Sequence, residues 1–283
     1  MPIFDPHIHM SSRTTGDYRA MYAAGVRTVV EPSFWVGQPR TSADTMADYF
    51  ASLLGWEPFR AAQYGITHYC AIALNPKEAN DPRCAAILDR LPGYLDKDGV
   101  VAVGEVGFDA MTDEEEHAFA TQLDLAAEHS LPVLVHTPHR AKLDGTLRSL
   151  ALIEKSGLPP GRVVLDHLNE LTVGPAADSG CWMGFSIYPD SKMEPDRMVR
   201  IMRNFGTDRI LVNSAADWGN SDPLLTRATA DAMRGAGFGD DDIDQVFWRN
   251  PAAFYGQSGR LRPGPAPDGQ YAGNTVARGD ARG

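Results

Sequence analysis

The chain has 283 residues, an apolar content of 43% and a formal net charge of −11. This composition suits a globular protein with a sizeable core, and no apolar run approaches the ~20 residues that would cross a bilayer. The acidic balance argues against a broad nucleic-acid groove, because phosphate binding depends on clustered Lys and Arg.

Eight short apolar runs alternate with stretches of helical spacing. In chain order the expected strands are Ile3–His9, Val26–Glu31, Thr67–Leu74, Val100–Val106, Pro132–His136, Val163–His167, Trp182–Ile187 and Ile210–Asn213. The clearest expected helices are Glu114–Glu128, Leu143–Lys155, Arg197–Phe205 and Pro223–Arg234. Nearly continuous Val, Ile and Leu indicate strands buried on both faces, as in a parallel sheet covered by helices. Eight such units predict a (β/α)8 TIM-type barrel, and a doubly wound sheet is the alternative.

Two segments fall outside this repeat, so we assign residues 1–256 to one barrel and treat these segments separately. Residues 34–63 form a long connection that contains Trp35 and Arg40. It is interpreted either as a loop and helix over the barrel mouth, where it would select substrate, or as an extra helix on the flank. Residues 257–283 are rich in Gly, Pro, Ala and Asp, which predicts a flexible tail.

Metal-ligating residue types follow several of the expected strands. His7 and His9 lie two residues apart, so in a strand they would project to the same face. The other strand ends of this kind carry Glu105, His136, His167 and, four residues after Asn213, Asp217. In a parallel barrel all these ends meet at one mouth. One such histidine is usually structural, but this set predicts a metal site.

These motifs in this order resemble the TatD-like branch of the metal-dependent amidohydrolase superfamily. The resemblance is carried by Asp5-Pro6-His7-Ile8-His9, Gly104-Glu105-Val106-Gly107-Phe108-Asp109, Leu131–His136, His167 and the late Asn250-Pro251 with Phe254-Tyr255-Gly256. It covers roughly residues 3–256.

The resemblance implies a hydrolase with two divalent metal ions. By analogy, His7 and His9 would hold the first ion and His136 and His167 the second. Glu105 would bridge the two ions, and Asp217 would complete the first site and act as base or proton shuttle. Such mixed nitrogen and oxygen ligands allow Zn, Mn, Fe or Mg. A water held by the ions would lose its proton near neutral pH and become the nucleophile.

The chain departs from the family pattern at three places. The Glu-Thr-Asp expected on the last strand is replaced by Asn213-Ser214-Ala215, so Asp217 arrives late and Asp222 is the reserve candidate. Asn75 stands where the family has a histidine, and the fifth strand is followed by His139 and Arg140 in new positions. All three changes surround the predicted metals, which points to a different substrate. The candidate substrate contacts are Glu31, Trp35, Arg40, Asn75, His139 and Arg140.

We therefore expect a hydrolase acting on a small-molecule ester, phosphoester, amide or lactone, with no membrane partner. A TatD-type deoxyribonuclease is the alternative within the family, and a non-hydrolytic binding or scaffold subunit is the alternative outside it. Three separated cysteines, Cys70, Cys84 and Cys181, favour a reducing compartment, and the first strand starts too early for a secretory signal. A cytoplasmic location is expected.

Overall fold

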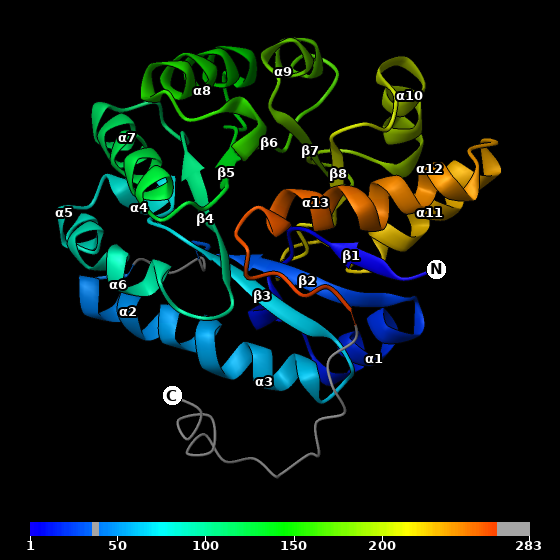
Figure 1. The fold of residues 1–283 in the computed structure, drawn as a ribbon, viewed down its shortest axis with the longest axis horizontal. Helices are drawn as coiled ribbons and strands as arrows, with labels where there is room; N and C mark the ends of the chain where they lie inside the picture. The colour runs from blue at the N-terminus through cyan, green and yellow to red at the C-terminus, as the bar shows by residue number, and fades with distance from the viewer. Residues whose placement is uncertain (36–39, 265–283) are drawn as a thin grey trace.

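The computed structural model describes residues 1–35 and 40–264. Eight parallel strands are hydrogen-bonded in the order of the sequence, with helices arranged around them (Figure 1). The strands are β1 Ile3–Asp5, β2 Val26–Pro32, β3 Thr67–Ile72, β4 Val100–Gly107, β5 Val133–His136, β6 Val163–Asp166, β7 Trp182–Ser186 and β8 Ile210–Asn213. This sequential order confirms the (β/α)8 barrel, because a doubly wound sheet reverses its strand order at one point.

The barrel is closed by hydrogen bonds between the residues that follow the first strand and those that follow the last strand. The amide of Ala215 donates to the carbonyl of His7 at 2.8 Å, and the amide of His9 donates to the carbonyl of Ala216 at 3.0 Å. The segments after β1 and β8 are thereby joined at the C-terminal end of the barrel.

The helices follow the strands along the chain, and most of them cover the outside of the barrel. Their bounds are α1 Thr15–Ala23, α2 Ala43–Ala51, α3 Glu57–Ala62, α4 Pro76–Ala79, α5 Pro82–Ala85, α6 Leu91–Leu95, α7 Asp113–Glu128, α8 Lys142–Ser156, α9 Val173–Ser179, α10 Pro195–Phe205, α11 Leu225–Gly235, α12 Asp240–Asp244 and α13 Asn250–Gly256. The four helices expected from spacing correspond to α7, α8, α10 and α11. None of the described helices is long and apolar enough to cross a bilayer.

Five expected strands are longer than the observed ones, and for β5 and β7 the difference is a single residue. β1 ends at Asp5 because Pro6 has no amide hydrogen to donate to the ladder. β3 ends at Ile72 rather than Leu74, and β6 ends at Asp166, where His167 turns into the left-handed region at φ 61°. His7 and His9 therefore lie beyond β1, and strand alternation does not account for their orientation.

Apolar side chains form two buried clusters. The larger cluster lies between the strands and the surrounding helices, and the smaller one fills the barrel interior. Tyr255 of α13 belongs to the interior cluster, where its ring stacks on Phe4 at a centroid distance of 5.9 Å. Its hydroxyl donates to the carbonyl of Pro6 at 2.7 Å. The barrel is thus a filled core, and the polar chemistry is confined to its end.

The connection predicted at 34–63 divides into two parts. Phe34 and Trp35 line a cavity at the barrel mouth, whereas residues 36–39 lie outside the described residues. Helices α2 and α3 are joined by a π-helical turn, Ser52–Trp56, and Phe50 and Leu53 pack into the outer core. Among the described residues of this segment, Phe34 and Trp35 reach the mouth, and its helices cover the flank beside β3 (Figure 1).

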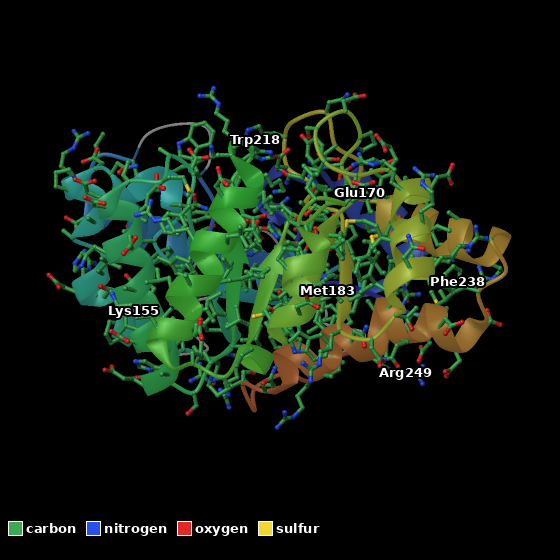
Figure 2. The ribbon with its side chains drawn as sticks, turned by 90° about the horizontal axis from the view of Figure 1, so that it is seen from above. Lys155, Glu170, Met183, Trp218, Phe238 and Arg249 are labelled. Atoms are coloured by element: carbon green, nitrogen blue, oxygen red, sulfur yellow. The ribbon has the colours of Figure 1, made fainter. Side chains whose placement is uncertain are left out.

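The segment predicted to be a flexible tail begins with residues that contact the barrel. The carbonyl of Gly264 accepts hydrogen bonds from Thr28 and Thr67, and Leu261 is buried in the interior cluster. Residues 257–264 are therefore part of the packed structure, and 265–283 lie outside the described residues. In the side view of Figure 2, Trp218, which follows β8, marks the mouth, and Arg249 lies at the opposite end.

Candidate metal centre

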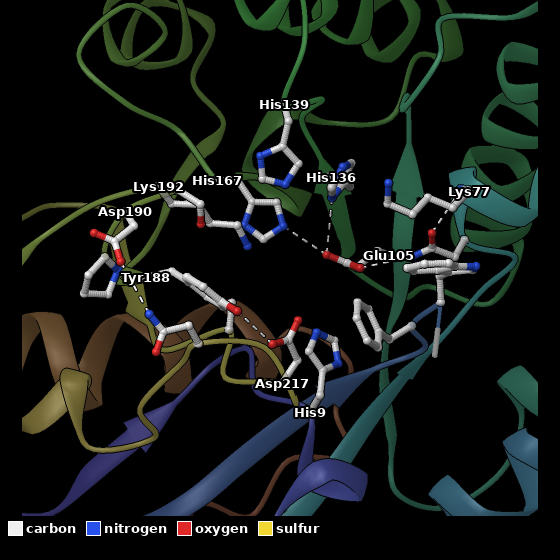
Figure 3. A pocket seen from close by; sticks show the side chains of 17 residues that line it. His9, Lys77, Glu105, His136, His139, His167, Tyr188, Asp190, Lys192 and Asp217 are labelled. Carbon is white, nitrogen blue, oxygen red and sulfur yellow. Dashed lines mark hydrogen bonds and ion pairs between the residues drawn. The ribbon is translucent and has the colours of Figure 1, made fainter. Parts of the chain in front are cut away.

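The C-terminal ends of the strands surround a cavity of about 420 Å³. Its walls include His9, Glu105, His136, His167 and Asp217 together with the aromatic side chains of Phe34 and Trp35 (Figure 3). His7 is fully buried just beneath this wall. A volume of this size is typical of sites that bind small molecules.

Two groups of potential ligands share one carboxylate. His7, His9 and Glu105 form one group, and Glu105, His136 and His167 form the other; within each, ligand atoms lie within 4.8 Å of one another. Oε1 of Glu105 lies 3.5 Å from Nε2 of His7, 3.2 Å from Nε2 of His167 and 3.6 Å from Nδ1 of His136. The Nε2 atoms of His7 and His9 are 3.1 Å apart. Glu105 thus stands between two histidine pairs.

Asp166 also belongs to this cluster, although sequence reasoning did not select it. Its Oδ2 lies 2.5 Å from Nδ1 of His7, and its carboxylate accepts hydrogen bonds from the side-chain amide of Asn213. Asp166, His7 and His167 form a third group of potential ligands. The sequence does contain a feature that could have identified Asp166 as a site residue. It is a carboxylate in an otherwise apolar strand, immediately before His167.

Local backbone geometry brings these side chains to the mouth. Asp166 and His167 are consecutive and would point to opposite faces in a regular strand. The left-handed conformation of His167 interrupts that alternation, so both side chains join the cluster. The register of β4 against β5 shifts between Gly104 and Val106, which leaves Glu105 unpaired and turns it toward the mouth.

Glycines leave room for this arrangement at two positions. A Cβ on Gly184 of β7 would lie 2.5 Å from Oδ1 of Asp166, so any side chain there would displace the carboxylate. A Cβ on Gly104 would lie 2.6 Å from Cβ of Leu134 on the neighbouring strand. At both positions the backbone lies so close to a side chain of the neighbouring strand that only glycine fits.

Electrostatics favour an ionised Glu105 and neutral rings at His9 and His167. Against the effect of burial, the carboxylates of Glu105 and Asp166 raise the pKa of His7. Burial opposes ionisation of Glu105, but the surrounding histidines, His7 first, hold its pKa well below the usual range. Burial is also the main reason why the pKa values of His9 and His167 lie well below the usual value for histidine. An anionic carboxylate among neutral imidazoles is a donor set suited to a divalent cation.

Buried ring nitrogens indicate that a ligand belongs at this site. Among the described residues, Nδ1 of His9 and both ring nitrogens of His136 are buried without a hydrogen-bond partner. Buried polar atoms are normally satisfied, so the unpaired nitrogens of His136, one of which lies 3.6 Å from Oε1 of Glu105, call for an additional binding partner. By contrast, Nδ1 of His7 and Nδ1 of His167 contact Asp166 and Ser186, which leaves their Nε2 atoms toward Glu105. The residues present therefore fit metal ions.

Asp217 occupies a separate place on the cavity wall. Its Oδ1 accepts hydrogen bonds from the hydroxyl of Tyr188 at 3.0 Å and the amide of Gly219 at 2.7 Å. In the part of the chain that the structure describes, Asp217 joins none of the three ligand groups. It lines the same cavity and faces the site from the β8 side (Figure 3).

Three of the expected substrate contacts lie in the cavity wall. Trp35 and His139 line it directly. Asn75 lines it as well, and its side-chain amide donates to Oε2 of Glu105 at 3.0 Å, which orients the carboxylate between the histidines.

The other three expected contacts lie elsewhere in the described structure. Glu31 is fully buried and contacts Nε2 of His68 at 2.8 Å. Arg40 is neutralised by the buried carboxylate of Glu78, with N–O distances of 2.6 and 2.7 Å. Arg140 is exposed and is not among the described residues that line the cavity.

Fold and site together define a (β/α)8 barrel with a candidate polyhistidine metal centre at its catalytic end. The family model for TatD related DNases matches residues 4–233, so this chain belongs to the TatD family. The protein is a metal-dependent hydrolase of that family.

Relatives of this chain match it along nearly their whole length. An uncharacterized metal-dependent hydrolase of Methanocaldococcus jannaschii is 24% identical over 255 residues, which is 89% of this chain and 99% of the relative. The structure is similar to that of a TatD-like protein from Archaeoglobus fulgidus, with a TM-score of 0.74 and 24% identity over 89% of this chain and 99% of the other. It is also similar to the Escherichia coli phosphotriesterase homology protein, with a TM-score of 0.65 and 17% identity over 90% and 98% of the two chains.

Proposed function

We propose that this protein hydrolyses a small-molecule ester, phosphoester, amide or lactone with the help of two divalent metal ions. His7 and His9 would hold one ion, His136 and His167 the other, and Glu105 would bridge them. The observation that carries this proposal is the placement of Glu105 between the two histidine pairs. Metal ions held there would supply a deprotonated water as nucleophile and would polarise the bond to be cleaved.

The surrounding residues hold these groups in place. Asp166 receives the Nδ1 hydrogen of His7 and Ser186 contacts Nδ1 of His167, so both imidazoles direct Nε2 toward Glu105. Asn75 donates to the second oxygen of Glu105 and limits its rotation.

Asp217 is our candidate for moving the proton of the nucleophile. It lies on the cavity wall opposite His136, and one of its oxygens is fixed by Tyr188 and Gly219. The other oxygen has no hydrogen bond in the described structure and is available to a reactant. A carboxylate held in this way is suited to general acid–base catalysis.

Elemental analysis combined with a substrate panel tests the proposal. The protein as purified should contain close to two divalent ions per chain, and their identity would select among Zn, Mn, Fe and Mg. The panel should include phosphomonoesters and phosphodiesters, carboxylic esters, amides and lactones, each assayed before and after chelation. Metal-dependent turnover of a small molecule supports the proposal, whereas a metal-free protein with no turnover would overturn it.

The second candidate function is a TatD-type deoxyribonuclease, which the family description itself favours. The net charge of −11 and the cavity of about 420 Å³ make a small molecule the better fit. Single-stranded and double-stranded DNA therefore belong in the same panel. Faster metal-dependent cleavage of DNA than of every small molecule would decide for the nuclease.

A further inference from the structure

Lys192 is the cation of the cavity wall that lacks a carboxylate partner in the described structure. It lies between β7 and α10, and its side chain points from this loop toward His167 (Figure 3). The other lysines near the site are already engaged. Nζ of Lys77 pairs with Asp109 at 2.7 Å, and Nζ of Lys142 donates to Thr137 at 2.8 Å.

The loop backbone determines where Lys192 lies. The amide of Tyr188 donates to the carbonyl of Met193 at 2.9 Å, and the amide of Lys192 donates to the carbonyl of Tyr188 at 2.9 Å. Met193 is fully buried and forms an isolated bridge with Ile187. Lys192 therefore stands on an anchored turn, in contrast to a freely moving surface lysine.

The charge of Lys192 is incompletely balanced by the protein. Burial lowers its pKa, and Glu105, Asp166 and Asp217 oppose this effect from a distance. Two of these carboxylates already serve the candidate metal centre. A partly desolvated ammonium group without its own counter-ion is costly, and a bound anion would relieve that cost.

Another part of the cavity wall is aromatic. The ring of Phe34 stacks on the imidazole of His9 at a centroid distance of 3.9 Å and an angle of 26°. Trp35 lines the cavity beside it. The cavity therefore combines a flat apolar surface with a cation that has no carboxylate partner among the described residues.

We propose that Lys192 binds an anionic oxygen group, a carboxylate or a phosphate, of a small substrate whose apolar body lies against Phe34 and Trp35. This group is distinct from the bond that is cleaved. The inference rests on the proposed function, because it concerns the same cavity. It makes Lys192 a specificity-determining residue: an uncharged compound of the same shape would bind, but more weakly.

Two pairs of probes that contain no hydrolysable ester can measure this preference. Calorimetry would compare 4-phenylbutyrate with 4-phenylbutanol, and benzylphosphonate with benzyl alcohol, on protein with its metal content measured. We expect wild type to bind the anion of at least one pair about 10-fold more tightly than the alcohol. The pair that shows the preference would distinguish a carboxylate from a phosphate ligand.

Variants then assign the preference to Lys192. Lys192→Met should reduce it to less than about 2-fold, and Lys192→Arg should retain most of it. Lys77→Met is the matched control, because Lys77 lines the same cavity but is paired with Asp109, and it should leave the preference unchanged. Lys192→Gln replaces Lys192→Met if the latter does not fold.

Two results would overturn the proposal: no preference in wild type, or a preference that survives the loss of Lys192, since the metal ions would then bind the anion. The measurement does not depend on turnover. A protein that is inert on the whole substrate panel but shows a Lys192-dependent preference would contradict the proposed function alone.

Discussion

The carboxylate of Asp166 lies 2.5 Å from Nδ1 of His7, although the two residues are 159 positions apart in the chain. This contact joins the end of β6 to the segment after β1. Because Nδ1 of His7 faces the carboxylate, Nε2 faces Glu105. Asp166 is thus a positioning residue for one side of the candidate metal centre.

Asp166→Asn should weaken metal binding without removing a predicted ligand of either ion. The amide keeps the shape of the side chain but loses the charge that holds His7 in the required tautomer. We expect the metal Kd to rise ~10–100-fold, measured by competition with a chromogenic chelator. Asp222→Asn is the control, because the side chain of Asp222 is exposed and, among the described residues, accepts a hydrogen bond only from the backbone amide of Leu224. Equal affinity in both variants would contradict the positioning role.

Replacement of each histidine pair should remove a different metal ion. Replacing His7 and His9 together by Ala should remove one ion per chain, and replacing His136 and His167 together should remove the other. Elemental analysis of the two double variants, with circular dichroism to verify folding, measures this directly. Two ions retained by both variants would show that the assignment is wrong.

Glu105→Gln should affect both sites at once. Glutamine preserves the shape, but its amide offers one neutral oxygen where the carboxylate offers two charged ones. Both metal occupancies should therefore fall together, and metal-dependent turnover should fall with them. Full metal occupancy and full activity in this variant would show that Glu105 is not a ligand of the metal ions.

Asp217→Asn should reduce kcat by ~10²–10⁴-fold while much of the metal is retained. The reason is its position on the cavity wall, outside the three ligand groups but facing the site. Steady-state kinetics and metal analysis of the same preparation separate these effects, and Asp222→Asn again serves as the control. If Asp222→Asn abolished activity while Asp217→Asn remained near wild type, the proton-transferring carboxylate would have been misassigned.

Arg40→Met should lower stability and leave catalysis unchanged. Glu78 is buried against Arg40, so removal of the guanidinium leaves a buried carboxylate without its partner, at a cost of ~3–5 kcal/mol. Urea unfolding measures this loss, and the double variant Arg40→Met with Glu78→Gln should recover part of it. A large rise in KM with unchanged stability would restore Arg40 as a substrate contact.

The sequence by itself predicted the barrel and pointed to five of the six histidines and carboxylates that cluster at its mouth in the described structure. Buried strands of parallel type carry a nearly continuous apolar pattern, so His136 and His167 stand out at the point where that pattern stops. The same reasoning identified Glu105, because a carboxylate in a buried strand requires a partner. His7 and His9 converge as expected, although the prediction of a strand through both was wrong.

Only the tertiary structure decided which neighbours each polar residue meets. The sequence suggested Arg40 and Glu31 as substrate contacts. In the folded protein Arg40 pairs with Glu78, and Glu31 contacts His68. Asp166 gains its role from His7, and Lys192 stands out because no carboxylate among the described residues pairs with it. Pairing of charges depends on contacts between distant segments, and these contacts form only when the strands close around a common axis. Local spacing describes one strand at a time and contains no information about them.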